Sequence, residues 1–196
     1  MLPSRRALNT MSMSMPSSMS GGWTVEMLPA LPDDGKHYEI IDGEMYVTPS
    51  PTYAHQVVAA RITAELVPFM RATSLGTVVP DVDVASGERT MVRPDILVVR
   101  PVEGRIPERP LDARDILLAV EILSPSSLET DRGAKRRLYM RLGVPEYWIV
   151  VRDERSVERW RPGVEFPEVV REPLVWAPIA GGAEVTIQLK AIFEGT

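Results

Sequence analysis

Two apolar runs, each with a single carboxylate inside it, constrain this chain more than any other feature. The runs are Ile116–Ser124 (ILLAVEILS), which contains Glu121, and Val92–Val99 (VRPDILVV), which contains Asp95. Such runs are typical of buried strands. A carboxylate placed there costs several kcal/mol, on the order of an unpaired buried charge, unless a cation meets it. The sequence therefore predicts that both acids lie beside a cation at one end of a sheet.

A hard divalent cation suits this pair of acids. Asp95 and Glu121 fall on consecutive predicted strands, where two carboxylates repel each other unless a cation lies between them or one is protonated. Mg²⁺, or Mn²⁺ in its place, binds through oxygen ligands, and Mg²⁺ keeps waters and substrate phosphate oxygens in its shell. The alternative is an ordinary buried ion pair with an arginine such as Arg93 or Arg100.

Composition narrows the class of protein. With 196 residues, 44% of them hydrophobic and 25% charged, the chain has the values of one globular domain with a sizeable core. It has no cysteine and only two histidines, which excludes disulfides, cysteine nucleophiles and multi-histidine zinc sites and fits a cytoplasmic location. No apolar run approaches the ~18 residues of a membrane span. The net charge of −5 argues against bulk coating of nucleic acid but leaves room for a local basic face.

The first residues, Met1–Gly22, differ from the rest of the chain. They are rich in Met and Ser, contain no acid and show no apolar periodicity, which favours a disordered leader or a later start codon. An Arg- and Ser-rich start also resembles a transit peptide, but the amphipathic pattern is missing. We expect a tail over residues 1–22 and a single domain over residues 23–196.

The remaining patterns predict a mixed α/β order. A short helix capped by Thr24 comes first, and Asp42-Gly43 predicts a hairpin. Thereafter the expected elements are a helix over Tyr53–Ala72, strands over Gly76–Val84, Thr90–Arg100 and Asp115–Ser124, a helix over Asp131–Leu142, and strands over Glu146–Val151, Val157–Arg161 and Glu184–Leu189. This order predicts an α/β sandwich around a mixed central sheet with extra β-hairpins.

The second long helix carries the candidate cationic residues. Asp131 and Lys135 are four residues apart and share a helix face, directly after the Glu121 strand. Lys135 would reach the carboxylates and stabilise charge that develops on a phosphate; the alternative is a solvated ion pair with Asp131. The same helix has a basic cluster, which binds phosphates or pairs with the chain's own acids, formed by Arg132, Arg136 and Arg137.

Long stretches of the chain resemble the Uma-two family of proposed endonucleases, in the PD-(D/E)XK, restriction-endonuclease-like superfamily. They are YEIIDGEMYVTPSP, VRPDILVV, VEILSPSS and DRGAKRRLYMRLGVPEYWIV, in this order, within about Trp23 to Leu189. A bare PD…E pattern is too short to be specific. The long runs VEILSPSS and GVPEYWIV are much more specific.

The resemblance implies an αβββαβ core and divalent-metal-dependent hydrolysis of phosphodiester bonds in nucleic acid, with DNA the expected substrate. It implies Asp95 and Glu121 as metal ligands and the main-chain carbonyl of Ile122 as a further ligand. The chain departs from the superfamily's E-x-K pattern, because Leu123 stands two residues after Glu121. Lys135 on the following helix is then the candidate for the catalytic lysine.

Three further residues are candidates for a supporting role. The resemblance implies that an acid of the hairpin, Glu39 or Glu44, approaches the same end of the sheet; the alternative for both is an exposed strand position. His55 opens the first long helix, where it would contact phosphate or carry a proton, or pack against the Pro-rich loop before it. The aromatic residues Tyr147 and Trp148 are expected in the core.

Other function classes stay open from the sequence. The acidic net charge and the missing E-x-K lysine favour a catalytically silent nucleic-acid- or protein-binding module on the same fold. A hydrolase of small phosphorylated or carboxylated ligands also fits, because a fold does not fix a function. A homodimer would present two sites by two-fold symmetry, as a nuclease that cuts both strands needs. No membrane partner is expected.

Overall fold

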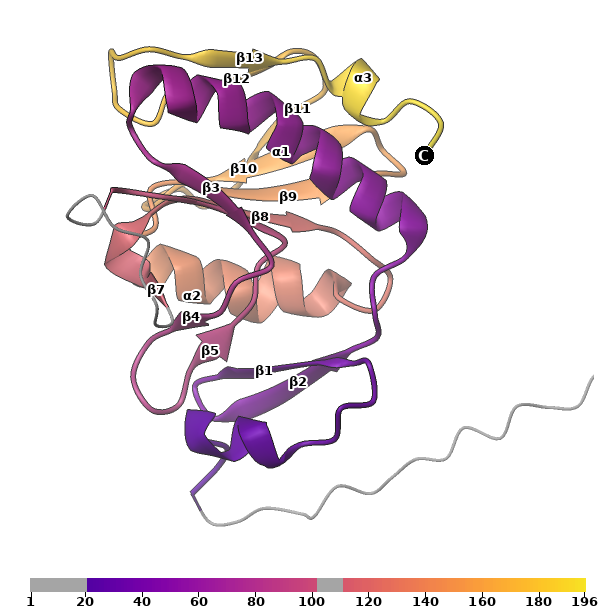
Figure 1. Ribbon diagram of the computed structural model, residues 1–196, viewed down its shortest axis with the longest axis vertical. Helices are drawn as coiled ribbons and strands as arrows, with labels where there is room; N and C mark the ends of the chain where they lie inside the picture. The colour runs from indigo at the N-terminus through magenta and orange to yellow at the C-terminus, as the bar shows by residue number, and fades with distance from the viewer. Residues whose placement is uncertain (1–20, 102–110) are drawn as a thin grey trace, which may run out of the picture.

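A mixed sheet of six strands forms the centre of the computed structural model, which describes residues 21–101 and 111–196 (Figure 1). The strands lie in the order β11-β10-β9-β8-β6-β3. Their bounds are β3 Thr77–Pro80, β6 Ile96–Val99, β8 Ile116–Ile122, β9 Tyr147–Val151, β10 Ser156–Trp160 and β11 Glu168–Val170. β8 and β9 are parallel, and the other neighbours are antiparallel.

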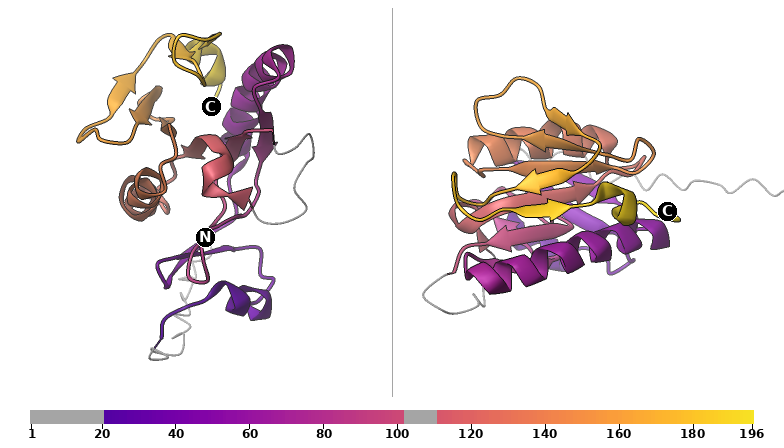
Figure 2. Two further views of the ribbon diagram at one scale, coloured as in Figure 1. Left: turned by 90° about the vertical axis from the view of Figure 1, so that its left-hand side faces the viewer. Right: turned by 90° about the horizontal axis from the view of Figure 1, so that it is seen from above.

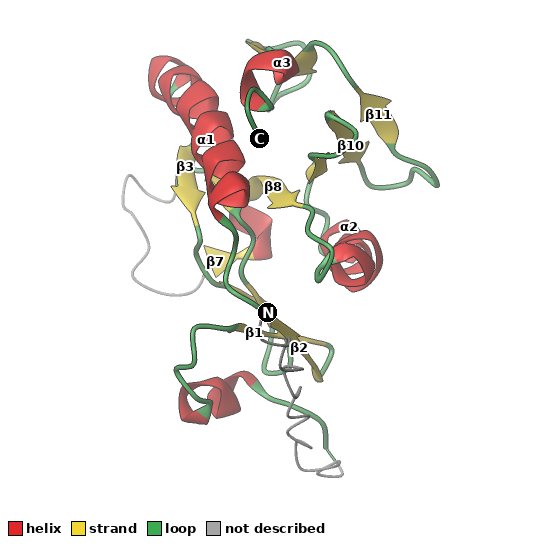
Figure 3. Cartoon of the chain, turned by 90° about the vertical axis from the view of Figure 1, so that its right-hand side faces the viewer, coloured by secondary structure: helices red, strands yellow, loops and turns green. Residues whose placement is uncertain are grey.

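A helical layer covers each face of this sheet (Figure 3). On one face lies α1 (Tyr53–Thr73), and on the other a π-helical turn, η3 (Thr130–Lys135), continues into α2 (Arg136–Arg141). In chain order, α1, β3, β6, β8, α2 and β9 give the predicted αβββαβ core. The α/β class and the mixed sheet are therefore confirmed.

Strand β8 is buried along its whole length and divides its side chains between the two helical layers. Val120 and Ile122 pack in the core with α1, whereas Ala119 packs in the core with α2. Glu121 has the parity of Ala119 and so lies on the α2 face. The neighbouring residues Tyr147 and Trp148 are fully buried, as predicted.

A second sheet of five strands lies at the end of the molecule that carries the N-terminal hairpin, in the order β2-β1-β5-β4-β7 (Figure 1). Its bounds are β1 His37–Ile41, β2 Glu44–Thr48, β4 Val84–Ala85, β5 Met91–Val92 and β7 Leu111–Asp112. The predicted hairpin is confirmed, since β1 and β2 pair antiparallel across Asp42 and Gly43. Both turn residues have positive φ, 53° and 85°, as a tight two-residue hairpin requires.

The strands expected over 76–84 and 90–100 are each divided in two. The first splits into β3 and β4 at Pro80-Asp81, and the second into β5 and β6 around Pro94. Proline cannot donate to a ladder, and Asp81 adopts a positive φ of 51°, so pairing stops at both points. The chain crosses between the two sheets at these breaks, and Asp95 stands at one of the crossings.

Two terminal elements also differ from expectation. Val25–Ala30 is a 3₁₀-helix (η1) whose Thr24 side chain makes no capping hydrogen bond. The expected strand over 184–189 is shorter: β13 (Val185–Ile187) pairs with β12 (Leu174–Trp176), and a short helix, α3 (Leu189–Ile192), follows. These C-terminal elements lie beside α1 and share its core (Figure 2).

One sequence prediction falls mostly outside the described residues. The tail over 1–22 is described only from Gly21. The division into a tail and one domain stays a prediction. Within the described ranges, no helix has the length and hydropathy needed to cross a membrane.

Gly76, just before β3, should not tolerate a side chain. A Cβ atom there would lie 2.5 Å from the carbonyl oxygen of Val99, which belongs to the backbone of the neighbouring strand. We expect Gly76→Ala to lower the free energy of unfolding in urea by about 1 to 3 kcal/mol through this overpacking. The matched control is Gly133→Ala in η3, where the nearest atom is 3.8 Å away; it should be neutral or slightly stabilising. Equal effects of the two substitutions would contradict this account.

Candidate active site

A pocket of about 230 Å³, here called the acid pocket, opens where the ends of several strands meet. Its lining comes from β1, the loop after β2, the start of α1, the residue before β6, the end of β8 with its following loop, η3, and the residue after β9. The acid pocket therefore joins both sheets and both helical layers.

Asp95 and Glu121 lie at the same end of the central sheet. The antiparallel register of β6 and β8 pairs Leu97 with Ala119, both in the core with α2. Continued by one pair beyond Ile96 and Val120, this register would set Asp95 opposite Glu121, and both side chains line the acid pocket. The structure thus brings the two acids together at one end of the sheet, as the prediction of a shared cation requires.

Two groups lie close to one carboxylate oxygen of Asp95, and one of them is a hydrogen-bond donor. Its Oδ2 accepts a hydrogen bond from the backbone N–H of Ile122 at 2.7 Å, and Nε2 of His55 lies 3.2 Å from the same atom. Among the described residues, none donates a hydrogen bond to Oδ1. Asp95 is thereby fixed in position with one oxygen left for a ligand.

Lys135 lies among carboxylates rather than in solvent. Its Nζ is 2.9 Å from Oε2 of Glu39, 2.9 Å from Oε1 of Glu121 and 3.8 Å from Oδ1 of Asp131. All four side chains are at least 95% buried, because the exposed fraction of each is 5% or less. The alternative of a solvated Asp131–Lys135 pair is wrong.

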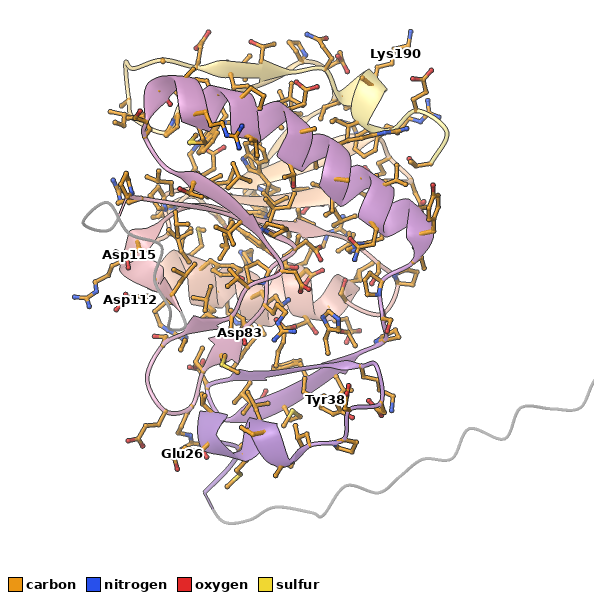
Figure 4. The ribbon with its side chains drawn as sticks, in the orientation of Figure 1. Glu26, Tyr38, Asp83, Asp112, Asp115 and Lys190 are labelled. Carbon is orange, nitrogen blue, oxygen red and sulfur yellow. The ribbon has the colours of Figure 1, made fainter. Side chains whose placement is uncertain are left out.

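Glu39 is an internal residue, contrary to the simple alternation argument that left it exposed. The face of β1 that carries Glu39 also carries Ile41, which packs in the core with α2. Oε1 of Glu39 accepts the backbone N–H of Arg93 at 2.6 Å, while the Arg93 guanidinium turns to Asp83, which is labelled in Figure 4. Both faces of β1 are covered by other parts of the protein. The alternation of side chains along this strand therefore does not place Glu39 in solvent.

The electrostatics of the acid pocket favour an added cation. Burial raises the pKa of Glu121 well above its usual value, and Asp131, Asp95 and Glu39 add to this while Lys135 opposes it. Burial raises the pKa of Asp131 to about 6. Burial alone would lower the pKa of Lys135, but the surrounding carboxylates raise it well above its usual value. One ammonium therefore faces an excess of acidic groups.

The donor set fits a Mg²⁺-type ion but not a cage made by protein alone. Within the described ranges, no group of three or more His, Asp or Glu side chains is arranged to hold a metal ion. Mg²⁺ needs only one or two carboxylates, with water and phosphate oxygens completing its shell. Asp95 and Glu121 supply two carboxylates, and Ile122 lies beside them in the lining.

The structure leaves the other predicted residues outside the acid pocket. Glu44 is exposed next to the hairpin turn and pairs with Ile41. It therefore lies two residues along β2 from the position opposite Glu39, a distance of roughly 7 Å. Arg132 pairs with Glu158, and the Arg136 guanidinium lies 4.6 Å from the centre of the Trp160 ring. Arg137 is exposed on the same helix. None of these residues lines the acid pocket.

Sequence reasoning missed part of the lining. Ser124, Ser126 and Ser127 follow β8 directly, and Arg152 follows β9 directly. The sequence did contain a signal that could have found them. Polar residues that follow two apolar, parallel strands lie at the same edge of the sheet. His37 also lines the acid pocket and carried no sequence signal.

Comparisons with known proteins give one family and one similar fold. Residues 25–188 match the model of the Uma2 family, described as "Putative restriction endonuclease". No curated protein gave a match. The chain is similar in structure to a "putative nuclease belonging to DUF820" from Anabaena variabilis, with a TM-score of 0.73 and 22% sequence identity over 87% of this chain and 97% of that chain. The similarity confirms the restriction-endonuclease-like fold.

Asp131 should make stability depend on pH in the metal-free protein. The pKa of Asp131 in the folded state is about 6, above its ordinary value of 3.8, so the folded state binds this proton more tightly than the unfolded state does. The contribution of Asp131 to the free energy of unfolding is therefore lost as the pH rises from about 3.8 towards 6. We expect the stability of Asp131→Asn relative to the parent to rise by about 2 kcal/mol between about pH 4.5 and about pH 7, whatever its sign at the lower pH. Urea unfolding in the presence of a chelator measures this.

Asp153→Asn is the matched control for that experiment, because Asp153 is an exposed acid on the turn after β9. Its difference from the parent should stay nearly constant over the same pH range. A flat difference for Asp131→Asn as well would show that Asp131 ionises without a cost.

Proposed function

Since the chain belongs to the Uma2 family, we propose that it is a nuclease that hydrolyses phosphodiester bonds of nucleic acid in the acid pocket with a divalent cation. DNA is the expected substrate, and Mg²⁺ or Mn²⁺ the expected cation. The family's description supports the reaction class. The cation and the substrate rest on the chemistry of the acid pocket.

The observation that carries the proposal is the arrangement of Asp95, Glu121 and Lys135. Both carboxylates line the acid pocket at the same end of the central sheet, and Nζ of Lys135 lies 2.9 Å from Oε1 of Glu121. Oδ1 of Asp95 and Oε2 of Glu121 accept no hydrogen bond from any residue in the described ranges. A structural ion-pair network would not need these two open oxygens in an accessible pocket.

A divalent cation held by Asp95 and Glu121, with the Ile122 carbonyl as a further ligand, would polarise the phosphate and activate a water molecule. Lys135 has three N–H donors; it donates one to Oε1 of Glu121, and its Nζ lies 2.9 Å from Oε2 of Glu39. The third is available to a phosphate oxygen, where a positive charge stabilises the transition state. His55 keeps Asp95 oriented from the start of α1.

Cleavage assays with two isosteric variants test the proposal. Supercoiled plasmid, linear duplex, single-stranded DNA and RNA are each incubated with Mg²⁺ or Mn²⁺ and with the parent, Asp95→Asn or Glu121→Gln. We expect both variants to reduce the cleavage rate by about 100-fold or more, because each loses a carboxylate ligand. Calorimetric titration with Mn²⁺ should show weaker binding in both.

Glu44→Gln is the control, since it removes an acid from the same hairpin region outside the acid pocket. It should leave cleavage and Mn²⁺ binding unchanged. Cleavage that survives Asp95→Asn or Glu121→Gln would overturn the site. Binding of nucleic acid without cleavage of any substrate would favour a catalytically silent binding module on this fold.

A further inference from the structure

The acid pocket presents a difficulty for its own proposed substrate. Glu39, Asp95, Glu121 and Asp131 all line it, and a phosphodiester carries a further negative charge. Lys135 is enclosed by three of these acids, and the Arg93 guanidinium is bound to Asp83 at 2.8 Å. Both cations already have acidic partners within the protein.

Arg152 is the remaining lysine or arginine of the described lining, and it has no partner within the described ranges. Its Nε is buried and makes no hydrogen bond, and its guanidinium forms no ion pair with any described residue. A guanidinium held partly out of water without an acceptor is costly. The arrangement is accounted for if an anion from outside the protein supplies the acceptor.

The fold places Arg152 next to a group of hydroxyls. In the parallel pair of β8 and β9, Ile122 lies opposite Val150, so Ser124 and Arg152 each stand two residues further along. Oγ of Ser124 lies 3.0 Å from Oγ of both Ser126 and Ser127, and all three serines line the acid pocket. The serine hydroxyls and the Arg152 guanidinium therefore belong to the same strand-end edge of the acid pocket.

We propose that Arg152 binds a phosphate of the substrate at this edge, with the Ser124–Ser127 loop as the neighbouring wall. The planar guanidinium offers paired N–H donors that match two oxygens of one phosphate. This contact would draw the backbone of the nucleic acid towards Asp95 and Glu121 despite their charge. The inference rests on the proposed function and adds a phosphate-binding residue to it.

Binding without turnover tests this assignment. Fluorescein-labelled single-stranded and duplex DNA oligonucleotides are titrated with the full chain in Ca²⁺, with anisotropy as the readout. Arg152→Ala should raise the dissociation constant about tenfold or more, and Arg152→Lys should recover part of the loss. The slope of log K against log salt should fall by about one for Arg152→Ala.

Arg155→Asn is the matched control, since it removes one positive charge from the same turn outside the acid pocket. Asn tolerates the positive φ of 49° at this position. It should bind like the parent. An oligonucleotide with an uncharged methylphosphonate backbone should bind the parent and Arg152→Ala equally, which a merely structural role of Arg152 would not produce.

The outcomes separate this inference from the proposed function. Parental cleavage combined with parental affinity in Arg152→Ala would overturn the role of Arg152 and leave the nuclease intact. Binding that depends on Arg152 but is never followed by cleavage would support the phosphate contact and overturn the nuclease. Absence of oligonucleotide binding by the parent would overturn both.

Discussion

The structure depends on the burial of Lys135 among carboxylates. The ammonium contacts Glu39 on β1, Glu121 on β8 and, at 3.8 Å, Asp131 on its own helical turn. Removing one partner from such a buried group leaves a charge without compensation, which costs about 3 to 5 kcal/mol. The central sheet, the smaller sheet and the second helical layer are therefore joined by one cation.

Two interruptions of strand pairing allow this meeting of elements. Pro80-Asp81 and Pro94 end the pairing within the central segments and send the chain from one sheet to the other. Asp95 follows the second interruption directly, and its Oδ2 is then fixed by the N–H of Ile122 and by His55. The same breaks that divide the strands thus deliver an acid to the edge where Glu121 lies.

Local patterns predicted much of the fold and the location of the central acids. The apolar run of β8, the helical periodicity of α1 and the Asp42-Gly43 turn each depend on neighbours in sequence. The burial of Glu39 could not be read in this way, because it results from contacts with residues about a hundred positions away. For Arg132 and Arg136 the sequence left open phosphates or the chain's own acids, and their contacts with Glu158 and Trp160 come from β10, far along the chain. Such partners become visible only when the chain is folded.

The position of Lys135 has a consequence for how this family of sequences can be altered. Lys135 joins three elements, so a substitution there changes the stability of the fold as well as the activity. Arg152 at the open edge carries no such double requirement, since its side chain has no partner to lose within the described ranges. Diversification of substrate preference is therefore expected at the strand ends, while the lysine and its acids remain a fixed framework.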